Sequence, residues 1–351
     1  MITPADKDSN MDKEAILYEK LENGAVRCRL CCHYCRINDG SRGICGVRFN
    51  KDGILMTHAY GNPVCGNVDP VEKKPLYHFL PGTLSMSIAF PGCNFRCGFC
   101  QNWQISQDVS SYDGAPQEKY FPPRDIADAA VNNNCASVSY TYTEPTIFME
   151  YALDTCKAAR EKGLKNIFVT NGYMTPLALE TAAPWLDAAN VDIKFFKDDS
   201  YLEHCGAKLE PVLECVRLMK KLGIWVEITT LLIPGVNDSA QEIEGLAGFI
   251  SSLDRNIPWH ISRFHPDYKF NVYKSTPEQE IRKAVEIGRR AGLFYVYAGN
   301  MPGGWGSDTY CHRCQTLLVK REIFSILNYG LKDGKCPFCG EMTPGIFNVV
   351  L

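Results

Sequence analysis

Three cysteines stand close together in the chain, with the spacing C-x3-C-x2-C. Soft thiolate ligands favour zinc or iron–sulfur clusters, but a zinc site normally closes with a fourth Cys or His nearby. No Cys or His follows at the usual offset. The group therefore predicts a [4Fe–4S] cluster in which one iron has no protein ligand and can chelate a small molecule. Its members are Cys93, Cys97 and Cys100.

A second group of cysteines precedes this loop, with the spacing C-x2-C-x3-C-x9-C. Four thiolates complete a coordination shell, so the group predicts a closed site for zinc or for a second [4Fe–4S] cluster. The spacing leaves both alternatives open, and Cys32 or Cys65 are spare candidates for one of the ligands. The four expected ligands are Cys28, Cys31, Cys35 and Cys45.

A third group lies near the C-terminus, where two C-x2-C pairs are separated by 21 residues. Paired C-x2-C motifs are typical of a zinc ribbon or a rubredoxin-like knuckle, so the expected ion is zinc or iron. So small a module could scarcely fold without its metal, which indicates a structural role. The expected ligands are Cys311, Cys314, Cys336 and Cys339.

Composition limits the setting in which these sites work. Seventeen cysteines among 351 residues would indicate disulfides in a secreted chain, but no signal peptide precedes them and they cluster in short spacings. Metal binding in a reducing cytoplasm is the better account. The net charge of −3 argues against a nucleic-acid partner. The longest apolar runs are shorter than the roughly 18 residues of a membrane span.

Strands and helices alternate through the middle of the chain, which predicts a parallel α/β sheet with right-handed crossovers. Six units favour a partial (β/α)6 TIM-like barrel with small cysteine-rich metal modules at its N- and C-terminal ends, although a doubly wound sheet is an alternative. The expected strands are 84–90, 137–142, 166–170, 191–196, 225–233 and 259–264, with a further short strand at 293–298. The expected helices are 124–132, 146–162, 176–188, 210–222, 240–253 and 277–291.

The expected domains follow from this pattern: an N-terminal cysteine-rich extension (1–83), the partial barrel (84–300) and the C-terminal double C-x2-C module (301–351). Three smaller segments have predictions of their own. A short helix is expected within 13–22, a surface loop anchored by apolar side chains at 69–79, and a flexible glycine-rich linker at 299–306.

The cysteine loop also carries a family resemblance. C-x3-C-x2-C with an aromatic residue, Phe99, before the last cysteine resembles the signature of radical S-adenosylmethionine (SAM) enzymes. Residues 84–265 resemble the pyruvate formate-lyase activating enzyme group. The motifs that match are Tyr-Thr-Glu144-Pro, Asn171-Gly172, Asp192-Ile-Lys194 and a histidine after the sixth strand, His265. The first motif departs from the Gly-Gly-Glu-Pro of that group in its first two positions.

This resemblance implies roles for polar residues at the ends of the expected strands. SAM carries an amino group, a carboxylate, a ribose and an adenine. Glu144 is expected to accept from the amino group, Lys194 or Arg263 to meet the carboxylate, and Asn171 and Asp192 to bond hydroxyls. The resemblance further places Phe99 and His265 near SAM.

A closer resemblance covers nearly the whole chain. The N-terminal cysteines, the segment Asp69-Pro-Val-Glu-Lys-Lys-Pro-Leu-Tyr-His-Phe79, the cysteine loop and the C-terminal pairs look like the radical SAM enzymes of the AmmeMemoRadiSam system. That family is named for its association with Memo-like and AMMECR-like proteins, which are therefore expected partners. In the usual pattern a proline follows the second N-terminal cysteine, where this chain has Cys32.

The implied activity is reductive cleavage of SAM at the [4Fe–4S] cluster, giving methionine and a 5′-deoxyadenosyl radical that abstracts hydrogen from an unidentified substrate. A low-potential donor, ferredoxin or flavodoxin, would supply the electron in an anaerobic, oxygen-poor cell. One alternative is an activase that installs a glycyl radical on a partner enzyme. Another is a non-catalytic iron–sulfur electron carrier, which would not need acidic and amide residues at the strand ends.

Overall fold

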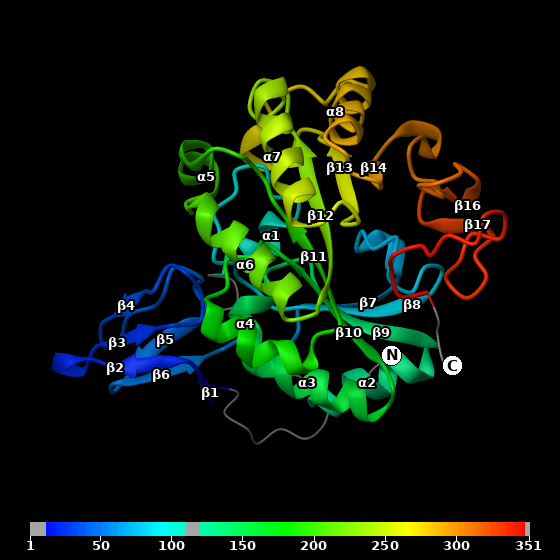
Figure 1. The fold of residues 1–351 in the computed structure, drawn as a ribbon. Helices are drawn as coiled ribbons and strands as arrows, with labels where there is room; N and C mark the ends of the chain where they lie inside the picture. Colours follow the sequence, from blue (N-terminus) through cyan, green and yellow to red (C-terminus); the bar gives the residue numbers. More distant parts are fainter. Residues whose placement is uncertain (1–11, 110–119, 348–351) are drawn as a thin grey trace.

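A twisted eight-stranded sheet forms the centre of the molecule in the computed structural model, which describes residues 12–109 and 120–347. Strands β8 to β14 run parallel to one another, whereas β7 (Cys65–Pro70) is antiparallel to β8. Because β7 and β14 form two separate edges, the sheet is an open, partial barrel (Figure 1). The parallel strands are β8 (Leu84–Ala89), β9 (Cys135–Tyr140), β10 (Lys165–Thr170), β11 (Ala188–Asp192), β12 (Trp225–Leu232), β13 (Trp259–Arg263) and β14 (Val296–Gly299).

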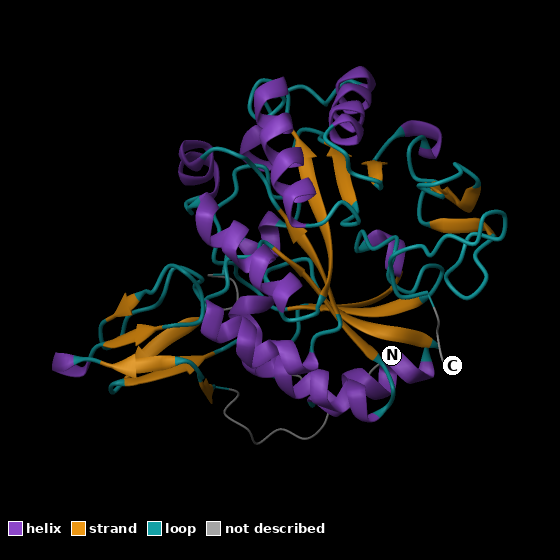
Figure 2. Ribbon diagram, in the orientation of Figure 1, coloured by secondary structure: helices purple, strands orange, loops and turns teal. Residues whose placement is uncertain are grey.

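Helices follow the parallel strands and lie along the outer side of the sheet (Figure 2). Each long helix buries one apolar face, as α6 does with Val212 and Val216. A side-chain cap starts α4, where Thr175 Oγ1 accepts from the N–H of Ala178. None of the helices in the described ranges combines the length and apolar character needed to cross a bilayer. The helices are α1 (Trp103–Ser106), α2 (Pro123–Asn132), α3 (Met149–Glu161), α4 (Pro176–Ala182), α5 (Asp198–Cys205), α6 (Leu209–Lys221), α7 (Ala240–Leu253) and α8 (Glu278–Arg290).

The predicted α/β architecture is therefore confirmed, with differences at particular elements. The predicted helix 176–188 ends early, because Ala183–Trp185 forms a 3-10 turn and the chain then enters β11. Pro184 lies in that turn and has no N–H to continue an α-helix. Strand β11 is consequently shifted toward the N-terminus from the predicted 191–196. Helix α5 was missed because it is short and buries only Tyr201 and Cys205, which gives a weak periodic signal.

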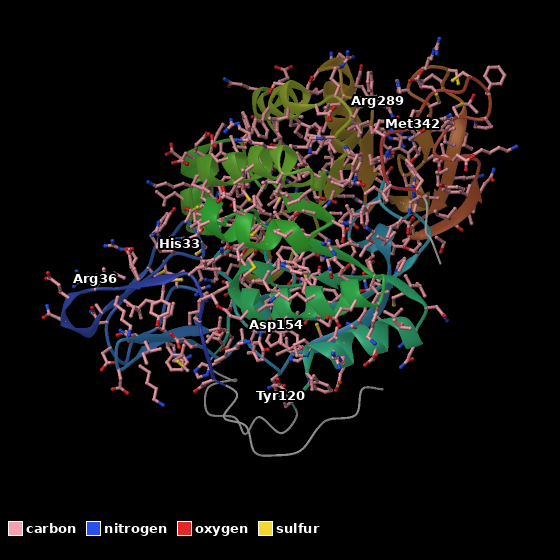
Figure 3. All side chains as sticks on the ribbon, turned by 60° about the horizontal axis from the view of Figure 1, so that its bottom comes forward. His33, Arg36, Tyr120, Asp154, Arg289 and Met342 are labelled. Atoms are coloured by element: carbon pink, nitrogen blue, oxygen red, sulfur yellow. The ribbon has the colours of Figure 1, made fainter. Side chains whose placement is uncertain are left out.

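The N-terminal module is built from two small antiparallel sheets. One contains β1 (Lys13–Glu14), β6 (Ile54–Thr57) and β5 (Arg48–Lys51); the other contains β2 (Tyr18–Lys20), β3 (Val26–Cys28) and β4 (Arg36–Ile37). The predicted helix within 13–22 is wrong, because its residues pair with β6 and β3 and Leu17 has a positive φ of 57°. Asp154 of α3 fixes this module to the barrel by accepting from Lys13 and Tyr60, both at 2.8 Å; Figure 3 labels Asp154 on the helix.

Residues 71–80, called the plug here, fill the barrel at the N-terminal ends of its strands. Asn190 of β11 donates to the carbonyl of Pro75 at 2.7 Å. The carboxylate of Glu227 in β12 accepts from the backbone N–H groups of Tyr77 (3.0 Å) and His78 (2.7 Å). Polar side chains inside the barrel therefore satisfy the backbone of a segment that would otherwise bury unpaired groups.

Burial of the plug corrects the expectation of a surface loop at 69–79. Leu76, Phe79 and His78 are 0% exposed, and Lys74 is 2% exposed. The apolar anchors were recognised in the sequence, but the acceptor that draws the segment inward, Glu227, lies about 150 residues further along the chain.

The C-terminal module is a three-stranded antiparallel sheet of β15 (Thr309–Tyr310), β16 (Leu317–Glu322) and β17 (Ser325–Tyr329). It docks on the plug, where Arg321 donates to the carbonyl of Tyr77 at 2.9 Å and His78 bonds the carbonyl of Pro344 at 2.7 Å. In Figure 1 this module (orange to red) and the N-terminal module (blue) lie on opposite sides of the barrel.

The segment 299–306 is packed against the barrel, although the sequence predicts a flexible linker. Ala298 N–H donates to the carbonyl of Gly306 at 3.0 Å. The guanidinium of Arg282 in α8 lies over the ring of Trp305, 3.9 Å from its centroid. A cation–π contact and a backbone hydrogen bond thus hold the path between the barrel and the C-terminal module.

Candidate functional site

The loop that carries Cys93, Cys97 and Cys100 follows the C-terminal end of β8. Two backbone bonds shape it: Gly92 N–H donates to the carbonyl of Ile105 at 2.8 Å, and Arg96 N–H donates to the carbonyl of Cys205 at 2.8 Å. The three cysteines line one cavity of about 570 Å³ at the C-terminal ends of the parallel strands. Parallel α/β barrels place their chemistry at this edge.

The environment of these thiols determines what the loop can bind. Burial raises the pKa of the Cys93 and Cys100 thiols, and the Cys205 thiol raises that of Cys97, 3.5 Å away between sulfur atoms. Buried thiols of this kind stay protonated until a metal centre replaces the proton. Soft sulfur donors with no fourth cysteine on the same loop suit an iron–sulfur cluster that keeps one iron open.

Glu144 stands beside this loop and is 2% exposed. Its Oε1 accepts from Thr146 and from the hydroxyl of Thr170 (2.7 Å), while its Oε2 accepts one bond, from the N–H of Asn171 (2.8 Å). Desolvation raises the pKa of the carboxyl group, and these donors oppose the shift. Because Oε2 has a lone pair left, Glu144 can accept from a cationic donor in the cavity.

Four more predicted cofactor residues line the same cavity. Asn171 donates to Asn94 Oδ1 at 2.7 Å, which orients its amide beside Cys93. Lys194 Nζ lies 3.0 Å from the carboxylate of Asp192, and 5.8 Å above the centroid of the Phe99 ring. The cavity thus combines carboxylates, an amide, an ammonium and an aromatic wall. The four are Phe99, Asn171, Asp192 and Lys194.

Arg263 and His265 lie outside the lining of this cavity. The guanidinium of Arg263 donates through Nε to the carbonyl of Thr276 at 2.6 Å, which ties it to the following loop. His265 is exposed, and its Nε2 lies 3.1 Å from Nε2 of Gln101, which does line the cavity. Between Lys194 and Arg263, the lysine is therefore the cation placed to meet a carboxylate in the cavity.

Several cavity residues were not predicted from the sequence. Lys73 and Lys74 of the plug line the cavity, and their Nζ atoms lie 2.8 and 2.6 Å from the carboxylate of Asp69. Thr229 of β12 also lines the cavity, and its buried hydroxyl has no hydrogen-bond partner within the described residues. Cys205 ends α5 as an isolated cysteine, so its contact with Cys97 has no signal in the sequence.

The N-terminal cysteines Cys28, Cys31, Cys35 and Cys45 line a second, small cavity together with Arg48. The spare candidates lie elsewhere. Cys32 Sγ points at the carbonyl of Met174, 3.3 Å away, and lines a different cavity. Cys65 lies in β7, paired with Ala89 of β8. The structure thus brings together the four cysteines with C-x2-C-x3-C-x9-C spacing.

The C-terminal cysteines Cys311, Cys314, Cys336 and Cys339 converge on one point. Their four sulfur atoms all lie within 4.8 Å of one another, and two pairs are 3.6 Å apart. Hydrogen bonds from Thr316 lower the pKa of the Cys314 thiol to about 6, which favours the thiolate that a metal requires. This group can hold a single metal ion.

Known proteins resemble this chain over different shares of its length. Residues 87–250 match the Radical SAM superfamily. An uncharacterised protein of Methanocaldococcus jannaschii is 45% identical over 332 residues, covering 94% of this chain and 98% of that protein. A second uncharacterised protein of the same organism is 25% identical, covering 80% and 79%. The pyruvate formate-lyase-activating enzyme of Clostridium pasteurianum is 23% identical, covering 64% of this chain and 96% of that enzyme.

Proposed function

Because the chain belongs to the radical SAM superfamily, we propose that it binds SAM in the 570 Å³ cavity and cleaves it reductively at a [4Fe–4S] cluster held by Cys93, Cys97 and Cys100. One observation carries this proposal. The three thiols line the same cavity as Glu144 and Lys194, so a cluster on the thiols would lie beside the residues proposed to bind SAM. When bound, the cluster supplies the electron that splits the sulfonium of SAM and releases a 5′-deoxyadenosyl radical.

Side chains of the cavity would bind and orient SAM by its charged and polar groups. Glu144 Oε2 accepts from the amino group, Lys194 meets the carboxylate, and Asn171 and Asp192 bond hydroxyls. Phe99 supplies an apolar wall, since it is 4% exposed and packs edge-on against Phe195. Glu144 and Phe99 are both buried, and exclusion of water from them strengthens their contacts.

The direct test is product formation by the reconstituted protein under anaerobic conditions. With dithionite and SAM, we expect methionine and 5′-deoxyadenosine, separated and counted by mass spectrometry. Cys97→Ala should form neither, while Cys65→Ala, which changes an isolated cysteine in β7, should form both. Absence of 5′-deoxyadenosine from wild-type protein that holds its cluster would contradict the proposal.

The role of Glu144 can be tested separately from the chemistry. Glu144→Gln keeps the shape of the side chain but removes its charge, which costs about 1.5–3 kcal/mol for a charged hydrogen bond. SAM should therefore bind roughly ten- to a hundredfold more weakly, as measured by equilibrium titration. Iron content should stay at the wild-type level. Unchanged affinity would show that Glu144 only supports the neighbouring backbone.

Activation of a glycyl-radical enzyme is the second candidate, favoured by similarity to the Clostridium pasteurianum activating enzyme. A protein substrate and a low-potential donor of the ferredoxin or flavodoxin class would then be partners. The narrower assignment to the AmmeMemoRadiSam type adds Memo-like and AMMECR-like proteins as candidate partners. Deuterated SAM tests them together, since label recovered in a partner protein or in a metabolite identifies what donates the hydrogen. We propose a reducing cytoplasm as the setting, because short cysteine spacings are typical of metal sites rather than of disulfides.

A further inference from the structure

The four N-terminal cysteines form a closed site, and we propose that it holds a second [4Fe–4S] cluster that passes electrons to the cluster at Cys93–Cys100. Cys28, Cys31, Cys35 and Cys45 all line one small cavity. Four thiolates can ligate the four irons of a cluster, so none would be left open for SAM. The spacing in the chain is equally compatible with zinc. The separation of the sulfur atoms in the folded protein favours the cluster.

The separation of the sulfur atoms favours a cluster over a single ion. Across residues 12–109 and 120–347, the C-terminal cysteines are the one group of three or more Cys, His or acidic ligands whose atoms all lie within 4.8 Å. The N-terminal four share a cavity, but no three of their sulfur atoms all lie within 4.8 Å of one another. One zinc ion draws four sulfurs to about 2.3 Å from itself. A cluster instead places each thiolate on a different iron, which needs a wider frame.

A buried arginine lies beside the N-terminal thiols and bonds one of them. Arg48 is 1% exposed and donates through Nη1 to the sulfur of Cys28 at 3.4 Å. Glu150 of α3 pairs with Arg48 and holds it in place. Such a hydrogen bond to sulfur stabilises and tunes a thiolate-bound cluster.

The loops of the two sites touch. Asn94 of the cluster loop bonds His33 through its carbonyl, 2.8 Å from Nε2. Arg96 donates to the carbonyl of Cys93 at 2.8 Å and also to the carbonyl of Ile44, the residue before Cys45. Figure 3 shows His33 where the N-terminal module meets the barrel, with Arg36 toward the outer edge of the module.

This position suits electron entry. Tyr34 and Ile44, each next to a cysteine of the site, are both 45% exposed and offer an apolar surface to a donor protein. One electron from a reduced flavin or iron–sulfur donor would reduce the N-terminal cluster. Transfer to the neighbouring cluster would return it to its oxidised state. This electron transfer from the N-terminal cluster to the SAM cluster, called the relay here, rests on the proposed function, whereas the presence of the N-terminal cluster does not.

Acid-labile sulfide gives a count that any ion in the C-terminal module leaves unchanged. Anaerobically reconstituted full-length protein should contain about eight sulfides per chain, four for each [4Fe–4S] cluster. The Cys93/Cys97/Cys100→Ala variant and the Cys31/Cys35→Ala variant should each keep about four. The matched control Cys32→Ala should keep all eight, because Cys32 faces another cavity.

Two results would overturn the cluster. In the first, the wild type contains only about four sulfides and zinc occupies the N-terminal module, and the Cys93/Cys97/Cys100→Ala variant contains no sulfide. The other is a Cys31/Cys35→Ala variant that retains eight. Since either variant alone decides the matter, misfolding of one, seen by circular dichroism, leaves the other informative.

The relay has its own measurement. A reduced flavodoxin should reduce the SAM cluster at least tenfold more slowly in Cys31/Cys35→Ala than in Cys32→Ala, followed by stopped-flow absorbance. Reduction by dithionite, a small reagent that reaches the SAM cluster directly, should proceed equally in both. Equal rates with flavodoxin would overturn the relay. Formation of 5′-deoxyadenosine by Cys31/Cys35→Ala with dithionite as the reductant tests the proposed function independently of the relay.

Discussion

The N-terminal and C-terminal modules each gather four cysteines on small antiparallel sheets, but they hold them at different separations. In the C-terminal module all four sulfurs lie within 4.8 Å of one another. In the N-terminal module they line a cavity with Arg48, and no three of their sulfur atoms all lie within 4.8 Å of one another. The first geometry suits one ion, and the second suits a cluster whose irons each take one thiolate.

The two groups of cysteines also differ in their distance along the fold from the loop that carries Cys93. The N-terminal site is packed against the loop that carries Cys93, and its Cys28 sulfur accepts a hydrogen bond from Arg48. The C-terminal site lies on the other side of the barrel and reaches it through the plug, by way of Arg321 and His78. Position and geometry are the grounds on which we propose a redox role at one end and a structural role at the other.

Loss of the C-terminal metal should have the largest effect on structure. Structural zinc contributes apparent free energies of about 10–16 kcal/mol in small modules. Cys311→Ser with Cys336→Ser should release the ion and expose residues 309–347 to hydrogen exchange, while the barrel stays protected. Metal analysis and exchange mass spectrometry measure both effects, with Cys65→Ser as the control. Full protection without metal would show that the module does not depend on it.

Removal of Arg48 should give the next largest effect, at the N-terminal module. Arg48→Met leaves the carboxylate of Glu150 buried without its partner, which costs about 3–5 kcal/mol. The exposed pair Arg27–Glu19 of the same module offers a control, since Arg27→Gln should cost less than about 1 kcal/mol. Urea unfolding measures both variants. Equal costs would mean that the buried pair does not organise the module.

Acid should weaken the docking of the C-terminal module through His78. Burial lowers the pKa of His78 to about 4, and its two ring nitrogens bond the carbonyl of Pro344 and the hydroxyl of Tyr297 (2.6 Å). Because the folded pKa lies below the usual 6.5, the neutral ring contributes fully above pH 6.5. That contribution is lost as the pH falls from about 6.5 to about 4.

The size of this loss follows from the shift, about 2–3 kcal/mol at pH 4.5. The free energy of unfolding of the wild type should therefore fall more steeply between pH 7 and 4.5 than that of His78→Gln. Both proteins lose bound metal in acid to the same extent, so the difference between their pH profiles reports His78 alone. Parallel pH profiles would show that His78 titrates normally.

Much of the barrel was predictable because its strands are apolar runs between amphipathic helices. The cysteine loop was predictable from its spacing. The polar residues at the strand ends could be grouped because a parallel sheet brings its strand ends to one edge. Five of the seven expected cofactor residues line the cavity, whereas Arg263 bonds Thr276 and His265 is exposed.

The sequence could not reveal contacts between distant segments. The plug is buried by Glu227 and Asn190, which lie far along the chain and have no local signature. Cys205 meets Cys97 only in the folded protein. The separation of sulfur atoms is equally invisible, because C-x2-C spacing in the chain is compatible with either a single ion or a cluster.

The most direct test of the central claim is the electron paramagnetic resonance spectrum of the dithionite-reduced protein before and after addition of SAM. We predict that SAM changes the signal in the wild type and in Cys31/Cys35→Ala, because both keep the open cluster at Cys93, Cys97 and Cys100. The Cys93/Cys97/Cys100→Ala variant should show no change. A SAM-dependent change that persists in this triple variant would contradict the assignment of the SAM site.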